Sequence, residues 1–407
     1  MADHSEIARW KLYILMGLMV FFGAGDTIIQ KYQNELTTKD ENGEEIKYKH
    51  PFFQALWMLI GEFWCLGVYK IYEWRVNKKY GGPENNPEII EAKEMGKSTS
   101  INVLLMAIPA TCDFIASAIM FLALIMIAAS IYQMMRGFLV FIVAILSIIF
   151  LKRKLYRHHW TSLALILIGL AVVGVSSVLH PQDENKESKD SASIKVIFGI
   201  ILVVVAQIFS GFQFIVEEKF FKNYYLHPLQ LVGWEGCWGT IITSITLVIL
   251  QFIKWDNKDV CPHGTLEDTP GALREWRKNN GLWITTILYI ISIANFNCLG
   301  VSITKYVSAA SRSTLSSART ALIWAYFVIS PGPGHEKFIW LELVGFLILI
   351  FGTFVFNEVL VIPFLGFNRY TQKNLKNNLK QEEVYSKRSF GNYTIYKNIQ
   401  DTLSNTK

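Results

Sequence analysis

The sequence predicts an all-α integral membrane protein with about ten transmembrane helices, arranged as two inverted five-helix repeats. Three observations lead to this fold class: the apolar composition, a series of long apolar runs, and short markers that recur at a near-constant spacing. Of the 407 residues, 52% are hydrophobic and 14% are aromatic, which excludes an ordinary soluble domain. Because about 20 apolar residues cross the hydrocarbon core of a bilayer, each long run predicts one membrane-spanning helix.

The apolar runs divide the chain into two groups of five spans. They cover residues 11–32, 51–73, 102–124, 129–151, 159–179, 194–216, 228–253, 282–304, 308–330 and 338–361. The first run is long and lacks a cleavage pattern of small residues, so we expect it to remain as a span. The predicted domains are a first five-helix repeat (1–180), a polar linker (181–193), a second five-helix repeat (194–361) and a cytosolic polar tail (362–407).

Lysine and arginine in the connections predict the orientation of the spans. With the N-terminus in the cytosol, the cytosolic connections carry more of these residues than the opposite ones, and the loop at 152–157 (KRKLYR) is the sharpest case. Cytosolic loops are enriched in Lys and Arg, so both termini are predicted to be cytosolic. The net charge of +6 lies in the loops and the tail, and we therefore expect a lipid bilayer rather than nucleic acid as the partner.

Three pairs of short markers indicate an internal repeat. His50-Pro51 opens the second span with Trp57 seven residues on, and the same pattern returns at His227, 177 residues later. The tripeptide Ala-Ala-Ser at position 128 and the tryptophan at position 160 recur 181 and 180 residues later. Because the repeated unit has an odd number of spans, its second copy must enter the membrane the other way up. Inverted repeats build the central site of many secondary transporters, which favours a carrier.

Arg136 is a full charge inside the predicted fourth span, with Tyr132 and Gln133 one helical turn before it. A lone arginine in a spanning helix costs at least ~2.5 kcal/mol, so it normally faces a protein interior or a wet cavity. One interpretation is an arginine that snorkels to the lipid headgroups from the first third of the span. The alternative is a cation that lines a cavity and binds an anionic ligand.

The ninth span and its approach carry three further cations, Lys305, Arg312 and Arg319, at intervals of seven residues. At 3.6 residues per turn, this spacing places them on one helical face. They either pair with carboxylates in the bundle or hold the phosphate or carboxylate groups of a ligand, for which arginine has a bidentate fork. The acidic residues at depth that could serve as partners are Asp26, Glu62, Asp113 and Glu235.

Two of these carboxylates, Asp113 and Glu62, have two open roles. They could carry protons, or they could be permanent partners of Arg136 and Arg319. A carboxylate inside a membrane is a functional candidate by default, but the sequence does not separate the two roles.

Other polar motifs are interpreted as ordinary membrane features. Glu217-Glu218, at the end of the sixth span, fits an interfacial cap, and His158-His159 beside Trp160 fits an interfacial anchor. The five cysteines are scattered and show no spacing typical of metal ligands or disulfides. The sequence has no G-x-x-x-x-G-K-[ST], H-E-x-x-H or G-x-S-x-G motif, and we therefore expect neither an enzyme nor a cofactor or metal site.

Five stretches together carry a resemblance to a known family. They are HPFFQALWMLIGEFWCL (50–66), SIYQMMRGFLVFIVAILSIIFLKRKL (130–155), LVVVAQIFSGFQFIVEEKF (202–220), HPLQLVGWEGCWG (227–239) and GVSITKYVSAASRSTLSSARTALIWA (300–325). With these stretches, the chain resembles solute carrier family thirty-five, subgroup F, in the branch of its sixth member. The resemblance covers nearly the whole of residues 10–361, in the same order and with few gaps. That branch is a nucleotide-sugar-transporter-like group of the drug/metabolite transporter superfamily.

The resemblance implies the drug/metabolite transporter fold, with ten helices in two inverted repeats, cytosolic termini and alternating access, often as an antiporter. In nucleotide-sugar carriers a Gly-Ala-Leu-Asn-Lys segment contacts the nucleotide, and residues 300–305 (GVSITK) match only its glycine and lysine. The implied location is an endomembrane, lysosome or Golgi, with the mitochondrial membrane as the alternative. Tyr396-Lys397-Asn398-Ile399 in the tail fits a tyrosine-type sorting signal for an adaptor. We also leave open that the protein assembles as a homodimer.

Together these inferences predict a secondary transporter for a small anionic organic metabolite, such as a nucleotide sugar. The expected substrate-binding residues are Arg136, Lys305 and Arg319, with Tyr132 and Gln133 orienting the substrate, while Glu62 and Asp113 balance charge or carry protons. Two other functions stay open: a carrier of cationic or zwitterionic metabolites, for which the carboxylates would be the binding groups, and a non-transporting scaffold that acts through its tail.

Overall fold

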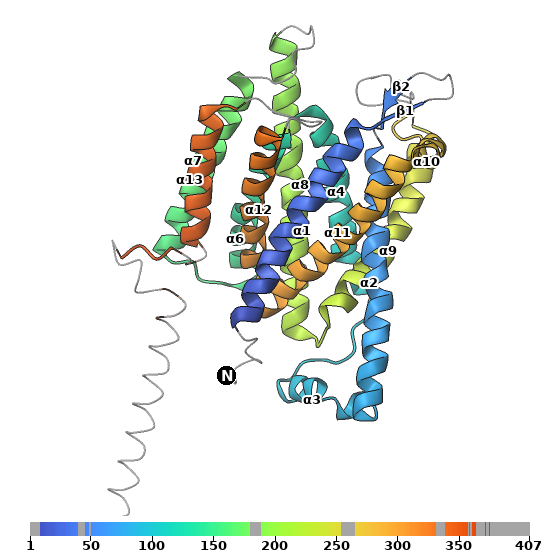
Figure 1. The fold of residues 1–407 in the computed structure, drawn as a ribbon. Helices are drawn as coiled ribbons and strands as arrows, with labels where there is room; N and C mark the ends of the chain where they lie inside the picture. Colours follow the sequence, from blue (N-terminus) through green and yellow to red (C-terminus); the bar gives the residue numbers. More distant parts are fainter. Residues whose placement is uncertain are drawn as a thin grey trace, which may run out of the picture.

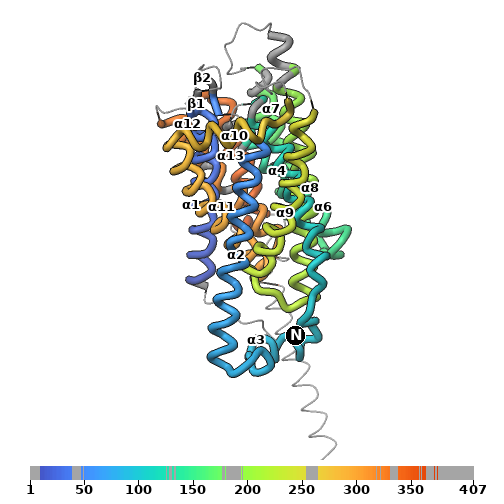
Figure 2. Tube along the Cα trace, turned by 90° about the vertical axis from the view of Figure 1, so that its right-hand side faces the viewer, coloured from blue at the N-terminus to red at the C-terminus, as the bar shows by residue number. Residues whose placement is uncertain are grey.

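The computed structural model of the protein describes residues 9–39, 45–48, 50–127, 129–179, 189–253, 265–330 and 338–356, and beyond them residues 358, 360–363, 371 and 374. Most of the described chain is helical, and the long helices run along a common axis as one bundle (Figure 1, Figure 2). The expected sorting signal Tyr396-Lys397-Asn398-Ile399 lies outside the described residues, as does most of the expected linker and tail.

The helices follow the predicted spans closely. In chain order they are α1 (Arg9–Glu35), α2 (Pro51–Tyr80), α3 (Pro87–Glu94), α4 (Ala107–Met126), α5 (Ala129–Met135), α6 (Phe138–Leu151), α7 (Arg157–Leu179), α8 (Lys189–Asn223), α9 (Pro228–Leu250), α10 (Thr269–Lys278), α11 (Asn280–Tyr306), α12 (Ala309–Ile329) and α13 (Trp340–Phe356). Two short 3₁₀ helices, η1 (Pro83–Asn85) and η2 (Val103–Met106), precede α3 and α4.

Seven helical segments of the described chain are long and apolar enough to cross a membrane: α1, α2, η2 with α4, α7, α8, α9 and α11. Two more helices, α6 and α13, are apolar but shorter. The remaining predicted span is α12, which is rich in serine and threonine and contains Arg312 and Arg319. The predicted helical fold is therefore confirmed, and the candidate spans agree with a multi-pass membrane protein.

A small β-hairpin lies outside the spans, which an all-α prediction does not include. Strand β1 (Thr37–Lys39) pairs antiparallel with β2 (Glu45–Lys47), and Thr38 lies opposite Ile46. The hairpin and α10 lie at one end of the bundle, which we call the hairpin end (Figure 1). The start of α1 and the short helix α3 lie at the opposite end, which we call the α3 end (Figure 1).

A buried cluster, which we call the His50 clasp, joins the two connections at the hairpin end. The Nδ1 atom of His50 lies 2.6 Å from an oxygen of Glu267, and its Nε2 atom lies 3.6 Å from an oxygen of Glu275. Thr38 of the hairpin donates a hydrogen bond of 2.8 Å to Glu275. Burial alone would lower the pKa of His50, but the two carboxylates raise it to about 9. The ring is therefore positively charged at neutral pH.

The repeated His-Pro marker is a helix-start signal in both halves of the chain. Pro51 and Pro228 occupy the first positions of α2 and α9, where the missing backbone N–H costs nothing. His50 and His227 are the preceding N-cap residues, and His227 Nδ1 accepts a hydrogen bond of 3.3 Å from the amide of Leu229. The two helices start at opposite ends of the bundle (Figure 1).

The predicted fourth span, 129–151, is two helices rather than one. Helix α5 ends at Met135, α6 begins at Phe138, and Arg136 and Gly137 form the turn between them. A Cβ atom on Gly137 would lie 2.8 Å from the side chain of Leu349 in α13. Glycine therefore allows α13 to approach the break, and the break places Arg136 at the junction of two helices.

The expectation that Lys305 shares a helical face with Arg312 and Arg319 is wrong. Helices α11 and α12 are separate, with residues 307 and 308 between them. The hydroxyl of Ser308 caps α12 by accepting a hydrogen bond of 3.1 Å from the amide of Ser311. A spacing of seven residues fits one helical face only while the helix continues, so Arg312 and Arg319 keep this relation and Lys305 does not.

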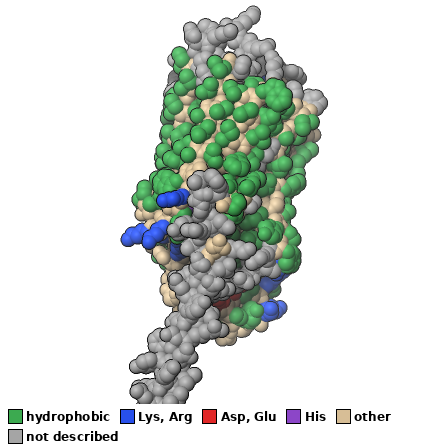
Figure 3. Space-filling model, turned by 90° about the vertical axis from the view of Figure 1, so that its left-hand side faces the viewer, with side chains coloured by type: hydrophobic (Ala, Val, Ile, Leu, Met, Phe, Trp, Pro, Cys, Tyr) green, Lys and Arg blue, Asp and Glu red, His purple; other side chains and the backbone are tan. Residues whose placement is uncertain are grey.

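The bundle is built from closely packed helix pairs: α2 with α9, α7 with α13, α4 with α8, and α1 with α11. Glycines bring the backbones together, because a Cβ atom on Gly236 of α9 would lie 2.2 Å from the backbone of α2, and one on Gly169 of α7 would lie 2.7 Å from the carbonyl of Gly345 in α13. Small residues allow this kind of packing between helices in a membrane. The face drawn in Figure 3 is mostly apolar, and the Lys and Arg side chains on it lie in the half nearer the α3 end.

Candidate substrate-binding site

A cavity with a volume of about 80 Å³ lies inside the bundle, between side chains of α1, α2, α4, α5, α6, α8, α11 and α12. Its charged lining residues are Asp26, Asp113, Arg136, Arg312 and Arg319. Pockets that bind organic ligands usually measure about 300–1,000 Å³. In this conformation the space between the lining side chains is therefore too small for a metabolite of nucleotide size.

Arg319 is fully buried, and two groups of α1 bind its guanidinium. Its Nη1 atom donates a hydrogen bond of 2.9 Å to the carbonyl of Gly23 and lies 3.3 Å from a carboxylate oxygen of Asp26. The guanidinium also lies over the ring of Phe296 in α11, 4.3 Å from its centroid. The missing side chain of Gly23 makes room for it, since a Cβ atom there would lie 2.7 Å from Arg319 Nη1. This side chain is therefore locked in one position and neutralised by one carboxylate.

Arg312 has an equivalent environment two turns earlier in α12. It forms a buried ion pair with Glu217 of α8 and lies 3.9 Å from the ring centroid of Phe214. Gly300 of α11 makes room for it, because a Cβ atom there would lie 2.8 Å from Arg312 Nε. Glu217 is fully buried, so the interpretation of this residue as an interfacial cap is wrong.

Arg136 differs from the other two arginines of the cavity. It is half-buried, and its guanidinium lies 5.7 Å from the ring centroid of the buried Tyr132. Among the described residues, no carboxylate forms a salt bridge with Arg136, although its guanidinium is close enough to Asp26 for the two charges to attract each other. Gln133 lies in α5, but its side chain is outside what the structure describes.

Two carboxylates, Asp113 and Glu62, lie in or next to the cavity lining. Asp113 of α4 lines the cavity and has no salt bridge to any described residue. Glu62 of α2 is buried next to the lining and accepts a hydrogen bond from the amide group of Asn297, which itself lines the cavity. Among the described residues, neither Arg136 nor Asp113 forms a salt bridge, so the cavity presents one cation and one carboxylate outside its two buried ion pairs.

Lys305 does not line the central cavity. It lies near the end of α11, and its Nζ atom lies 5.7 Å from the ring centroid of Tyr225 and 5.6 Å from that of Tyr306. Of the predicted substrate-binding residues, the structure brings together Tyr132, Arg136 and Arg319 around the cavity. It places Lys305 elsewhere.

Neutral polar side chains complete the lining, and sequence reasoning did not select them. Gln207, Ser210 and Gln213 lie on α8 at intervals of three residues, and Gln30 and Asn297 come from α1 and α11. The signal was available, because polar residues at this spacing in an otherwise apolar run indicate an inward-facing stripe. These groups can donate to or accept from the polar atoms of an organic ligand.

Two buried atoms of the cavity arginines still have hydrogen-bonding capacity. Nε of Arg312 and Nε of Arg319 are shielded from solvent and have no hydrogen-bond partner among the described residues. Buried donors normally find a partner in protein, water or ligand. Both arginines therefore keep one donor that the ion pairs with Glu217 and Asp26 do not use.

Comparison with known proteins places the chain in a family. A family model described as nucleotide-sugar transporter matches residues 16–258. The chain is 34% identical over 360 residues to solute carrier family 35 member F6 of Homo sapiens, covering 88% of this chain and 92% of that protein. It is 30% identical over 346 residues to the uncharacterized protein C12G12.12 of Schizosaccharomyces pombe, covering 85% of this chain and 97% of that protein.

More distant similarities point the same way. The UDP-galactose/UDP-N-acetylglucosamine transporter srf-3 of Caenorhabditis elegans is 24% identical over 188 residues, which cover 46% of this chain and 45% of that protein. A crystal structure of a protein aligns with a TM-score of 0.50 at 10% identity, over 86% of this chain and 98% of that chain, which concerns the fold alone. The family is one of transporters rather than enzymes, as the sequence predicted. The chain belongs to the nucleotide-sugar transporter family and is a membrane transporter related to solute carrier family 35 member F6.

Proposed function

We propose that the protein is a secondary transporter that works by alternating access, and that an anionic organic metabolite, such as a nucleotide sugar or a nucleotide-like solute, binds in the central cavity. The observation that carries this proposal is the difference between the three cavity arginines. Arg312 and Arg319 are paired with Glu217 and Asp26, whereas Arg136 has no carboxylate partner among the described residues.

Arg136 is the cation best suited to hold the substrate. An unpaired arginine inside a membrane protein is costly and is normally retained for a functional reason. Its guanidinium can form two parallel hydrogen bonds with a phosphate or carboxylate. Tyr132, one turn earlier and next to the guanidinium, would then orient the rest of the substrate.

The helix break beside Arg136 and the small volume of the cavity support a moving transporter rather than a static binding protein. Discontinuous helices form the substrate sites of many secondary transporters. A nucleotide-sized substrate needs several times the observed volume of about 80 Å³, so the helices that line the cavity must separate at one end to admit it.

The packing of the helices supports two inverted repeats. A two-fold axis that exchanges the first five spans with the last five would map the pairs α2–α9 and α7–α13 onto themselves. It would also exchange the pair α1–α11 with the pair α8–α4. These are the close helix pairs of the bundle, and the His-Pro markers start α2 and α9 at opposite ends.

Relatives of the chain favour a nucleotide-linked substrate. The relative srf-3 is named a UDP-galactose/UDP-N-acetylglucosamine transporter, and another relative, from Oryza sativa, is named CMP-sialic acid transporter 4. We extend this class to the present chain, with exchange for a second solute as the driving force. On the face drawn in Figure 3, Lys and Arg lie in the half nearer the α3 end, where the described chain starts. We take this as support for cytosolic termini, and we place the protein in an endomembrane such as the lysosome or Golgi.

A second candidate follows from the carboxylates. Asp113 lines the cavity without a salt bridge to a described residue, and Glu62 lies beside it. The cavity could therefore bind a zwitterion between Arg136 and Asp113, or Asp113 could carry the proton of a coupled exchange. Replacing Asp113 with asparagine would then reduce transport more than replacing Arg136.

The test is uptake of labelled nucleotide sugars and nucleotides into proteoliposomes that contain the purified protein. Losing a hydrogen bond to a charged group costs about 1.5–3 kcal/mol, so Arg136→Gln is expected to lower kcat/KM by roughly 10- to 100-fold. Lys305→Gln is the matched control, because it removes a cation outside the cavity and should leave uptake unchanged. Wild-type uptake by a folded Arg136→Gln protein would overturn the proposal.

A further inference from the structure

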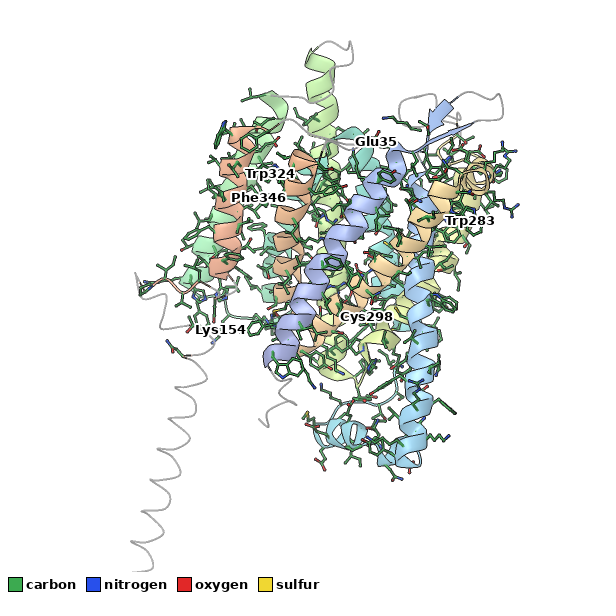
Figure 4. The ribbon with its side chains drawn as sticks, viewed as in Figure 1. Glu35, Lys154, Trp283, Cys298, Trp324 and Phe346 are labelled. Atoms are coloured by element: carbon green, nitrogen blue, oxygen red, sulfur yellow. The ribbon has the colours of Figure 1, made fainter. Side chains whose placement is uncertain are left out.

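Three side chains with metal-binding groups meet where α7 begins and α13 ends. His158 and His159 lie in the first turn of α7, and Glu358 follows the end of α13. Each residue has a donor atom within 4.8 Å of the donors of the other two. His158 Nε2 lies 3.4 Å from a carboxylate oxygen of Glu358, and the two imidazole rings have centroids 3.9 Å apart. Lys154 precedes the cluster at the same end of the α7–α13 pair (Figure 4).

The surroundings of His158 point to an ion. Only 3% of His158 is exposed, and neither of its ring nitrogens has a hydrogen-bond partner among the described residues. A buried imidazole without hydrogen bonds is unusual, and an ion is one of the few explanations for such a group. A cavity of about 10 Å³ is lined by His158, Glu358, Thr371 and four apolar residues but not by His159, whose ring must turn towards it to join the site. This volume is suited to a single ion or water molecule, not to an organic ligand.

The chemical types of the three donor groups indicate which metal ion they bind. Two imidazoles and one carboxylate are typical ligands of Zn²⁺, whereas Ca²⁺ and Mg²⁺ prefer oxygen donors alone. We propose that His158, His159 and Glu358 bind Zn²⁺ and that the ion joins the start of α7 to the residues that follow α13. The fourth position of a tetrahedral ion would be taken by water. The proposal does not depend on the transported substrate.

Small side-chain movements are enough to form the site. Ligand atoms about 2.0–2.1 Å from a tetrahedral Zn²⁺ lie roughly 3.4 Å apart. His158 Nε2 and Glu358 already have this separation, and no other donor pair has to close by more than about 1.4 Å. The amide of Tyr156 donates to His159 Nδ1 over 3.3 Å, a long contact that a metal bond can replace. Glu358 has a φ of 58°, which is uncommon for a residue other than glycine, and a metal bond to its carboxylate would hold it in place.

The test is metal binding by the purified full-length protein in detergent after treatment with EDTA. One Zn²⁺ per chain is expected, together with a rise in the unfolding temperature, and Mg²⁺ and Ca²⁺ should have no such effect. Co²⁺ should give the visible absorption of a four-coordinate site. Glu358→Gln and His159→Asn are expected to weaken Zn²⁺ binding at least tenfold and to abolish the Co²⁺ signal.

Controls separate loss of the site from loss of the fold. Glu358→Gln and His159→Asn lie at the ends of helices, and in EDTA they should elute and unfold like the untreated wild type. His227→Gln removes a histidine outside the cluster and should bind Zn²⁺ like the wild type. The proposal is overturned if the wild type binds no Zn²⁺, or if both cluster variants bind it with unchanged affinity and unchanged Co²⁺ absorption.

Discussion

The His50 clasp makes a quantitative prediction about pH. His50 is held by the carboxylates of Glu267 and Glu275, which raise its pKa from the usual 6.5 to about 9 against the effect of burial. At 1.36 kcal/mol for each pKa unit, this rise corresponds to roughly 3 kcal/mol of folding free energy. Because the pKa is higher in the folded state, the stabilisation is fully present below pH 6.5 and is lost as the pH rises through 9.

The perturbation is Glu275→Gln, which removes one carboxylate and keeps the contact between His50 and Glu267. We expect the pKa of His50 to fall below the wild-type value, and the loss of stability on raising the pH from 6.5 to 9 to become smaller. The pKa is measured by NMR of histidine-labelled protein in detergent, with His50→Gln to assign the signal. Apparent unfolding temperatures at the two pH values give the second readout.

The related histidine of the second half is the internal reference. Burial, with the nearby charge of Lys305, lowers the pKa of His227 to about 4, so its signal should stay that of a neutral ring at pH 6. The reasoning is refuted if His50 titrates near 6.5, or if Glu275→Gln leaves its pKa unchanged.

Two further predictions concern Arg319, the buried arginine of α12 that pairs with Asp26 of α1. Gly23→Ala would place a methyl group 2.7 Å from Arg319 Nη1 and from the ring of Phe296. We therefore expect the free energy of unfolding to fall by about 1–3 kcal/mol, with a lower unfolding temperature. Gly17→Ala is the control, because a Cβ atom there has nothing within 4 Å and should not lower the stability. Asp26→Asn would leave the Arg319 charge buried without its counter-charge, at a cost of about 3–5 kcal/mol. Adding Arg319→Met should restore part of that stability, and a double variant no more stable than Asp26→Asn would contradict the ion-pair interpretation.

Features that depend on a short stretch of chain could be predicted from the sequence. The spans follow from runs of apolar residues, and the starts of α2 and α9 follow from Pro51 and Pro228. The break between α5 and α6 could not be predicted in this way. It occurs where Gly137 meets Leu349, a residue more than two hundred positions away, so the local sequence still resembles one continuous apolar helix.

The candidate site was only partly predictable for the same reason. A charge in an apolar run marks Arg136 and Arg319 as inward-facing, and the structure places both beside the cavity. The sequence does not show which carboxylate each arginine meets, because the pairs Arg319–Asp26 and Arg312–Glu217 join distant helices. The spacing of Lys305 suggested that it shares a helical face with Arg312 and Arg319, but two residues separate the end of α11 from the start of α12.

The central claim is that Arg136 binds an anionic substrate in the cavity, and ligand-induced stabilisation of the purified protein tests it most directly. A ligand at about 100 times its Kd stabilises the folded state by roughly 2.7 kcal/mol, which is a readily measured rise in unfolding temperature. We predict that nucleotide sugars or nucleotides stabilise the wild type and Lys305→Gln but not Arg136→Gln. Equal stabilisation of Arg136→Gln, or stabilisation of the wild type by amines alone, would contradict the claim.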